Sequence, residues 1–101
     1  MPARLRIDPD AKAELDAAMA WYDERRVGLG KELLAAINEA LDRIQQSPAI
    51  GAPVAARLRS RRVMVKRFPY SVIYVPRGDE VLILAFAHGA QRPGYWKHRG
   101  R

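Results

Sequence analysis

Hydrophobic and polar positions alternate over the first few residues and then change to a helical period. Residues 4–7 alternate polar and apolar side chains, which is typical of a short, half-buried strand. Asp8 and Pro9 then favour a helix start, because an aspartate side chain accepts a hydrogen bond from a free amide of the first turn and a proline there needs no partner. The helix is predicted to continue to about Arg25, since one face is apolar: Leu15, Ala18, Met19 and Tyr22.

A second helical pattern follows a glycine-rich break. Gly28 and Gly30 permit a tight reversal, and the second helix is predicted to begin near Gly30 or Lys31 and to stop before Ser47-Pro48. Its apolar stripe consists of Leu34, Ile37, Leu41 and Ile44, with Leu33 and Ala40 at its flanks. The two segments predict an antiparallel helical hairpin that needs a sheet to cover its apolar faces. Two aromatic residues of the first helix are also expected in the core: Trp21 and Tyr22.

The second half of the chain is rich in strand-forming residues. Residues 49–60 carry glycine, proline and small side chains, so we interpret them as a loop. Three segments rich in Val, Ile, Leu, Phe and Tyr then predict strands: 61–68, 70–76 and 80–87. Pro69 and the cluster Pro76-Arg77-Gly78-Asp79 indicate short hairpin connections, so neighbouring strands should be antiparallel. The sequence therefore predicts one α+β domain over residues 1–101. Its element order is β-α-α-β-β-β, with the helical hairpin packed on one face of a small, twisted, mainly antiparallel sheet.

Composition excludes several kinds of chemistry. The 101-residue chain has no cysteine, which excludes disulfides, thiolate metal sites and cysteine nucleophiles. No metal-ligand spacing, phosphate-binding glycine loop or Ser/His/Asp triad is recognisable. The N-terminus lacks the apolar region of a signal peptide, and no apolar run approaches the ~20 residues that cross a bilayer. We therefore expect a cytoplasmic protein with no cofactor, no bound metal and no membrane partner.

Positive charge is concentrated in the second half of the chain. The net charge is +7 overall. Residues 1–50 hold 7 Lys/Arg against 9 Asp/Glu, which gives −2, whereas residues 51–101 hold 11 against 2, which gives +9. Such a field attracts polyanions or an acidic protein segment. The alternative is a solvated basic face that has no partner.

The densest basic run lies at the start of the predicted sheet, and its members are Arg57, Arg59, Arg61, Arg62, Lys66 and Arg67. On a regular strand successive side chains point to opposite faces, so only a subset of these cations can contact one ligand. Their other possible role is to solvate the ends of a core strand.

A second group of polar and aromatic residues follows the last predicted strand: His88, Arg92, Tyr95, Trp96, Lys97, His98 and Arg99. Arg92 can hold a phosphate or a carboxylate through two parallel hydrogen bonds, and Tyr95 or Trp96 can stack on a base or anchor a protein interface. His88 can act as an acid or base near neutral pH, although a lone histidine at a strand end is more often a hydrogen-bonded structural residue.

Short sequence motifs along nearly the whole chain, roughly residues 4–99, carry a family resemblance. The motifs are Trp21-Tyr22, Gly28-Leu29-Gly30, Arg67-Phe68-Pro69-Tyr70, Val72-Ile73-Tyr74 and His88…Arg92-Pro93…Tyr95-Trp96. In this order and spacing, the chain resembles the RelE/ParE family of toxins from type II toxin–antitoxin pairs.

The two branches of this family imply different targets. In the RelE branch the toxins cut messenger RNA on the ribosome, and an arginine usually precedes the apolar-apolar-Tyr segment, where this chain has Ser71. The chain is more similar to the ParE branch, through Phe68-Pro69-Tyr70 and His88-Gly89-Ala90. That resemblance implies a toxin that binds DNA gyrase and inhibits it without a catalytic residue of its own. Ribosome-dependent RNA cleavage remains the alternative.

The resemblance also implies a partner and a binding surface. The expected partner is a cognate antitoxin whose acidic, partly disordered C-terminal segment wraps the toxin in a hetero-oligomer and neutralises it. The expected target is DNA gyrase, or alternatively the ribosome with messenger RNA. The residues expected to bind the target are Arg59, Arg61, Arg67, His88, Arg92, Tyr95 and Trp96, and none is assigned a catalytic role.

Overall fold

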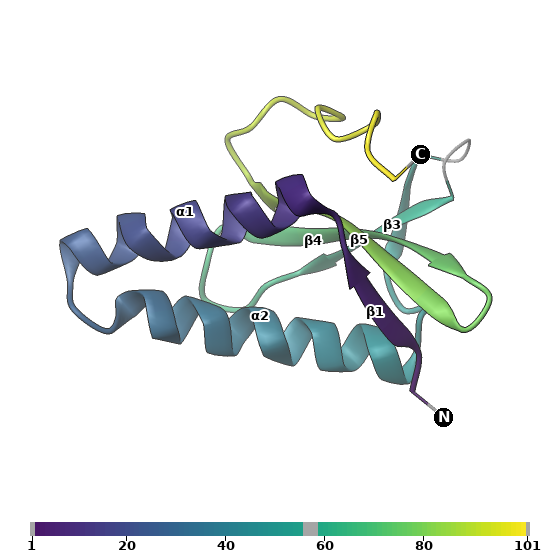
Figure 1. Ribbon diagram of the computed structural model, residues 1–101, viewed down its shortest axis with the longest axis horizontal. Helices are drawn as coiled ribbons and strands as arrows, with labels where there is room; N and C mark the ends of the chain where they lie inside the picture. Colours follow the sequence, from purple (N-terminus) through teal and green to yellow (C-terminus); the bar gives the residue numbers. More distant parts are fainter. Residues whose placement is uncertain (1, 56–58, 101) are drawn as a thin grey trace.

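Two antiparallel helices cover one face of a five-stranded sheet in the computed structural model, which describes residues 2–55 and 59–100 (Figure 1). The elements in chain order are β1 (Arg4–Ile7), α1 (Pro9–Arg25), α2 (Leu29–Gln46), β2 (Ala52–Ala55), β3 (Ser60–Met64), β4 (Tyr70–Arg77) and β5 (Glu80–His88). The strand order is β1-β5-β4-β3-β2, and only the β1–β5 pair is parallel. The predicted α+β class, the helical hairpin and the mainly antiparallel sheet are therefore confirmed. Neither described helix is long and apolar enough to cross a membrane.

The helical hairpin is fixed by side-chain caps and by one close backbone approach. The Asp8 carboxylate accepts a hydrogen bond from the Asp10 amide at 2.8 Å and caps α1, as the sequence predicted. Gly28 adopts the left-handed conformation at φ 90° and ends the turn between the helices. A Cβ on Gly30 would lie 2.6 Å from the Met19 carbonyl oxygen, so the two helices can meet here only because Gly30 has no side chain. The Gly30 amide donates to Asp23 at 2.8 Å.

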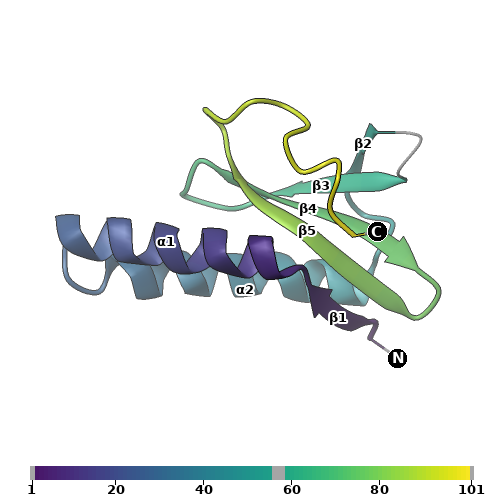
Figure 2. The same cartoon turned by 45° about the horizontal axis from the view of Figure 1, so that its top comes forward.

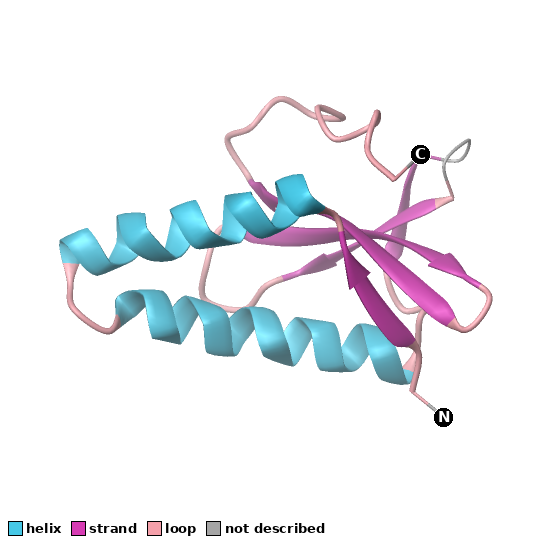
Figure 3. Ribbon diagram, viewed as in Figure 1, coloured by secondary structure: helices cyan, strands magenta, loops and turns pink. Residues whose placement is uncertain are grey.

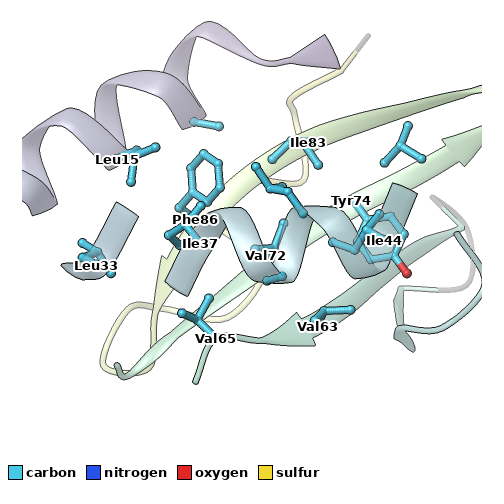
Figure 4. Packing of buried hydrophobic residues seen from close by; sticks show 14 of the residues in the cluster. Leu15, Leu33, Ile37, Ile44, Val63, Val65, Val72, Tyr74, Ile83 and Phe86 are labelled. Atoms are coloured by element: carbon cyan, nitrogen blue, oxygen red, sulfur yellow. The ribbon is translucent and has the colours of Figure 1, made fainter. Parts of the chain in front are cut away.

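The main core lies between the helices and the sheet. Figure 4 shows Leu33, Ile37 and Ile44 of α2 packed among buried strand residues such as Val72 and Phe86. The helical stripe is rotated slightly from the prediction, because Leu33 is fully buried whereas Leu34 is half-buried. The expectation that Trp21 is core is wrong, since its side chain is 49% exposed. Its neighbour Tyr22 is half-buried against the core, so the helix turns Trp21 outward.

Two segment assignments in the second half are corrected. The predicted loop at 49–60 contains β2, which pairs with β3 through Ala52 opposite Arg62. This edge strand was missed because its residues are small and exposed, and because Pro53 is tolerated only on an edge. The predicted strand 61–68 ends at Met64, since the chain turns through Arg67, whose φ is 71°.

The opposite face of the sheet carries a second apolar cluster, which we call the outer face. The β4–β5 register shifts where Ile73 pairs with Ala85 and Tyr74 pairs with Ile83, so Leu84 is an extra residue in β5. Residues 89–100, which contain no helix or strand, cross this face on the side away from the helices (Figures 2 and 3). The outer cluster consists of Ile73, Val75, Leu82, Leu84, Ala85 and Trp96.

Candidate target-binding face

Arg61 is engaged with the loop that follows α2. Its guanidinium donates hydrogen bonds to the carbonyl oxygens of Ala49 at 3.1 Å and Gly51 at 2.7 Å. The Tyr74 hydroxyl stabilises the same loop, because it donates to Pro48 O at 2.8 Å and accepts from the Gly51 amide at 2.9 Å. Burial is the main reason that the pKa of Tyr74 lies above its usual value. Arg61 therefore holds the loop to the sheet, and its guanidinium is occupied.

Arg67 pairs with a helix rather than facing a free surface. Its guanidinium lies 3.0 Å from Glu32 of α2, and the other Glu32 oxygen lies 2.6 Å from Arg26. The hydrogen bonds from Arg67 and then from Arg26 lower the pKa of the Glu32 carboxyl. Arg67 lies in the turn between β3 and β4 with φ 71°, a strained value for a residue other than glycine. The ion pair therefore joins a strained turn to the start of α2.

Arg59 lies at the other end of β3 and is separated from Arg67 by the length of that strand. It is exposed, has φ 53°, and borders a pocket of about 300 Å³ together with Pro53, Ser60, Arg61 and Pro76. Arg57, which belongs to the same basic run, lies outside the described residues. The structure therefore does not gather the predicted arginines Arg59, Arg61 and Arg67 into one site.

Trp96 is part of the outer core. Its side chain is only 3% exposed and packs in the cluster that contains Ile73, Leu82 and Leu84. Trp96 was among the residues expected to bind the target, but its buried side chain has little surface to offer a partner. Residues 89–100 need an apolar anchor to lie across the sheet, and Trp96 provides the largest one.

Tyr95 and Arg99 both bind Glu14 of α1. The Tyr95 hydroxyl donates to one Glu14 oxygen, and Arg99 lies 2.8 Å from the other. That second oxygen also accepts the Phe86 amide at 3.2 Å, while Arg99 donates to the Leu84 carbonyl at 3.1 Å. The pKa of Tyr95 is raised, first by burial and then by the Glu14 carboxylate. These bonds satisfy backbone groups of β5 beyond the end of its pairing with β1, and they fix the C-terminal segment.

His88 is held by hydrogen bonds at the end of β5. Its Nδ1 accepts from the Ala90 amide at 3.0 Å, and its own amide donates to the Gln91 side chain at 2.6 Å. In the neutral ring the hydrogen is therefore on Nε2. The ring packs edge-on against Tyr70, with ring centroids 5.1 Å apart. This arrangement agrees with the structural role that the sequence left open for His88.

A small pocket brings His88 and Arg92 together with Arg62 and Ser71, which were not among the residues expected to bind the target. This outer-face pocket, of about 160 Å³, lies on the outer face beside residues 89–100 and is bordered by Arg62, Ser71, His88, Arg92, Ile73 and Trp96. Arg62 and Arg92 are exposed, and neither has an ion pair or hydrogen bond to the residues that the structure describes. Successive side chains of a strand point to opposite faces of the sheet. Because Val63 points into the main core, its neighbour Arg62 points to the outer face.

A second, larger depression runs along α1. This α1 groove has a volume of about 460 Å³ and is bordered mainly by apolar and aromatic side chains: Ala17, Ala18, Trp21, Tyr22, Tyr70 and Phe86. At one end the Arg25 guanidinium lies 3.3 Å from the centroid of the Trp21 ring, which is cation–π geometry. From the sequence, Trp21 and Tyr22 of this groove were expected in the core, because the exposure of such residues depends on the angle between α1 and the sheet.

Comparison with known proteins now assigns the family. The family model described as "ParE toxin of type II toxin-antitoxin system, parDE" matches residues 5–93. The chain belongs to the ParE toxin family. Among solved structures, a chain of the chromosomal ParDE TA system from P. aeruginosa aligns with a TM-score of 0.73 and 24% identity, over 85% of this chain and 95% of that chain. This likeness supports the ParE toxin fold, and no curated protein matches the chain significantly.

Membership of the ParE family agrees with the residue at the strand position that separates the branches. Ser71 of β4 occupies the place where the RelE branch usually has an arginine, and its hydroxyl lies 3.1 Å from the Met64 sulfur. Arg62 of the neighbouring strand β3, which lies opposite Ile73, borders the same pocket as Ser71. The pocket thus differs from the arrangement that the RelE resemblance implies.

Proposed function

We propose that the protein is a growth-inhibiting toxin that binds DNA gyrase and needs no catalytic residue of its own. The observation that carries this proposal is the ParE family match over residues 5–93. The outer-face pocket supports binding rather than proton transfer, because Arg62 and Arg92 are permanently charged and the Nδ1 of His88 is already bonded to a backbone amide. The residues proposed to contact the target are Arg62, Arg92 and the exposed edge of His88.

The cellular experiment that tests this proposal separates DNA damage from translation arrest. After induction of the toxin, we expect DNA-damage signalling to rise before protein synthesis falls, because a trapped gyrase leaves broken DNA. Arg92→Ala should delay the damage response, and Arg4→Ala is the matched control, since Arg4 is an exposed arginine on β1. Translation arrest that precedes any damage signal would refute gyrase as the target and favour the ribosome.

We also propose that an antitoxin encoded beside the toxin neutralises it by covering the α1 groove. An acidic amphipathic segment fits this groove, because its apolar side chains can fill the space between Trp21 and Tyr70 while a carboxylate meets Arg25, which lies over the Trp21 ring. A groove of this kind suits a segment that folds on binding.

Co-expression with the adjacent small gene tests the antitoxin proposal. We expect a stable complex on purification and restored growth. Ala17→Arg in the toxin should weaken the complex, because it places a large charged side chain at the exposed edge of the groove, whereas Ala35→Arg on the exposed side of α2 should not. Purification without any complex, or growth inhibition that persists, would reject this partner.

A further inference from the structure

The outer-face pocket differs from most of the basic surface, because its arginines have no partner in the described part of the chain. Most described arginines have a carboxylate or carbonyl partner: Arg4, Arg6, Arg25, Arg26, Arg43, Arg61, Arg67, Arg77 and Arg99. No such partner is found among residues 2–55 and 59–100 for Arg59, Arg62 or Arg92. Arg59 borders the pocket at the start of β3, whereas Arg62 and Arg92 border the outer-face pocket together. No carboxylate borders the pocket within that part of the chain. Its two charged groups are therefore available to an external anion.

The segments that carry the two arginines are joined to the rest of the fold by hydrogen bonds and by packing. Arg62 is fixed by the pairing of β3 with β4, where it lies opposite Ile73. Arg92 is held in a series of short turns, because the Gln91 amide donates to His88 O at 3.0 Å and the Tyr95 amide donates to Arg92 O at 3.4 Å. The burial of Trp96 anchors the same turns to the sheet. A ligand thus meets one arginine from β3 and one from the C-terminal segment. The backbone of both segments is already ordered, which lowers the entropy cost of binding.

The donors of the pocket match a phosphate group better than a carboxylate. A carboxylate is flat and is matched best by donors that lie near its own plane, whereas the donors here come from β3, β4 and the C-terminal segment. A phosphodiester is tetrahedral, and its two non-bridging oxygens share one negative charge. It can therefore engage Arg62 and Arg92 together and accept from the Ser71 hydroxyl, whose present contact is a weak one to the Met64 sulfur.

Apolar surface beside the pocket fits the rest of a nucleotide. Met64 is 58% exposed and Val54 is 41% exposed, and Val54 borders the pocket. Exposed apolar side chains next to cations provide contact for a sugar or a base edge next to a bound phosphate. No acid borders the pocket among the described residues, and residues 51–101 contain only Asp79 and Glu80.

We propose that the outer-face pocket binds a phosphodiester of a nucleic-acid backbone through Arg62, Arg92 and Ser71. This inference goes beyond gyrase binding, because it concerns direct contact between the toxin and nucleic acid. The test contains no gyrase, so a negative result would leave the proposed gyrase inhibition standing. In the same way, a failure of gyrase inhibition would leave nucleic-acid binding standing. DNA and RNA share this chemistry, and the experiment separates them.

The test is fluorescence anisotropy of the purified toxin with a labelled DNA duplex and a labelled single-stranded RNA at several salt concentrations. Arg62→Ala and Arg92→Ala should each weaken binding about tenfold, as expected when a charge-assisted hydrogen bond is lost. Each should also reduce the slope of log affinity against log salt by about 0.9 for the duplex, or about 0.7 for the single strand. Arg4→Ala, which removes the same charge from the distant strand β1, should change affinity much less. The ligand that binds more tightly identifies the source of the phosphate.

Further variants keep the result independent of folding. Arg62→Lys keeps the charge and should recover part of the affinity, and Ser71→Ala should cause a smaller loss. A thermal melt of each variant shows whether the exposed side chains have been removed without unfolding. Equal losses in Arg4→Ala, Arg62→Ala and Arg92→Ala would overturn the proposal, since they would indicate attraction by net charge alone. No binding to either nucleic acid, or pocket-dependent binding to a polyglutamate peptide instead, would also overturn it.

Discussion

Trp96→Ala is expected to destabilise the protein strongly, because the side chain anchors the C-terminal segment to the outer face. A large aromatic residue buries roughly 200 Å² on folding, and at about 25 cal/mol per Å² this corresponds to about 5 kcal/mol. Core Trp→Ala substitutions cost about 3–5 kcal/mol, and a compact unfolded state lowers the area-based value, so we expect about 3–4 kcal/mol. Since Trp96 is 3% exposed, nearly all of its surface contributes.

Urea denaturation followed by far-ultraviolet circular dichroism measures this loss. Trp21→Ala is the matched control, because it removes the same side chain from a site that is 49% exposed. We expect the control to lose about 1–2 kcal/mol, in proportion to its smaller buried area. A loss for Trp96→Ala that is no greater than the loss for Trp21→Ala would refute the assignment of Trp96 to the core.

Three further predictions concern the helices and the C-terminal tether. Ile37→Ala should cost about 2–5 kcal/mol in urea denaturation, and Leu34→Ala clearly less, because Ile37 is fully buried and Leu34 is half-buried; equal losses would contradict the observed rotation of α2. Gly30→Ala should lower the melting temperature although alanine favours helices, because its Cβ would lie 2.6 Å from the Met19 carbonyl oxygen; a higher melting temperature would show that the helices separate without cost. The raised pKa of Tyr95 means that its contribution to stability is complete below its unfolded pKa of about 10 and is lost as pH rises toward the folded value. Stability should therefore fall above about pH 10, and an unchanged pH dependence in Tyr95→Phe would place the cause elsewhere.

Local signals in the sequence predicted the helical half of the fold well. The Asp8 cap, the glycines at 28 and 30 and the apolar period each act within a few residues, so the sequence alone contains the information. The strand β2 was missed because its pairing partner, not its composition, makes it a strand. The burial of Trp96 was missed for the same reason, since the outer cluster forms only when residues 89–100 fold back over β4 and β5.

The candidate site was predicted only in part. The sequence placed His88 and Arg92 on one surface, and the structure brings them together in the outer-face pocket. Charge density alone could not separate Arg61 and Arg67, which bind a loop and a helix, from Arg62, which remains available. Those partners lie 10 or more positions away in the sequence, so only the folded chain distinguishes paired arginines from free ones.

The measurement that tests the central claim most directly is a supercoiling assay with purified gyrase and toxin. We predict that the toxin inhibits supercoiling and increases the amount of cleaved DNA bound to gyrase, and that Arg92→Ala weakens both effects. Removal of a buried hot-spot contact costs roughly 2 kcal/mol or more, so the inhibitory concentration should rise at least about thirtyfold if Arg92 is buried in the complex. Normal gyrase activity, together with codon-positioned cuts in ribosome-bound messenger RNA that disappear in Arg92→Ala, would contradict this account.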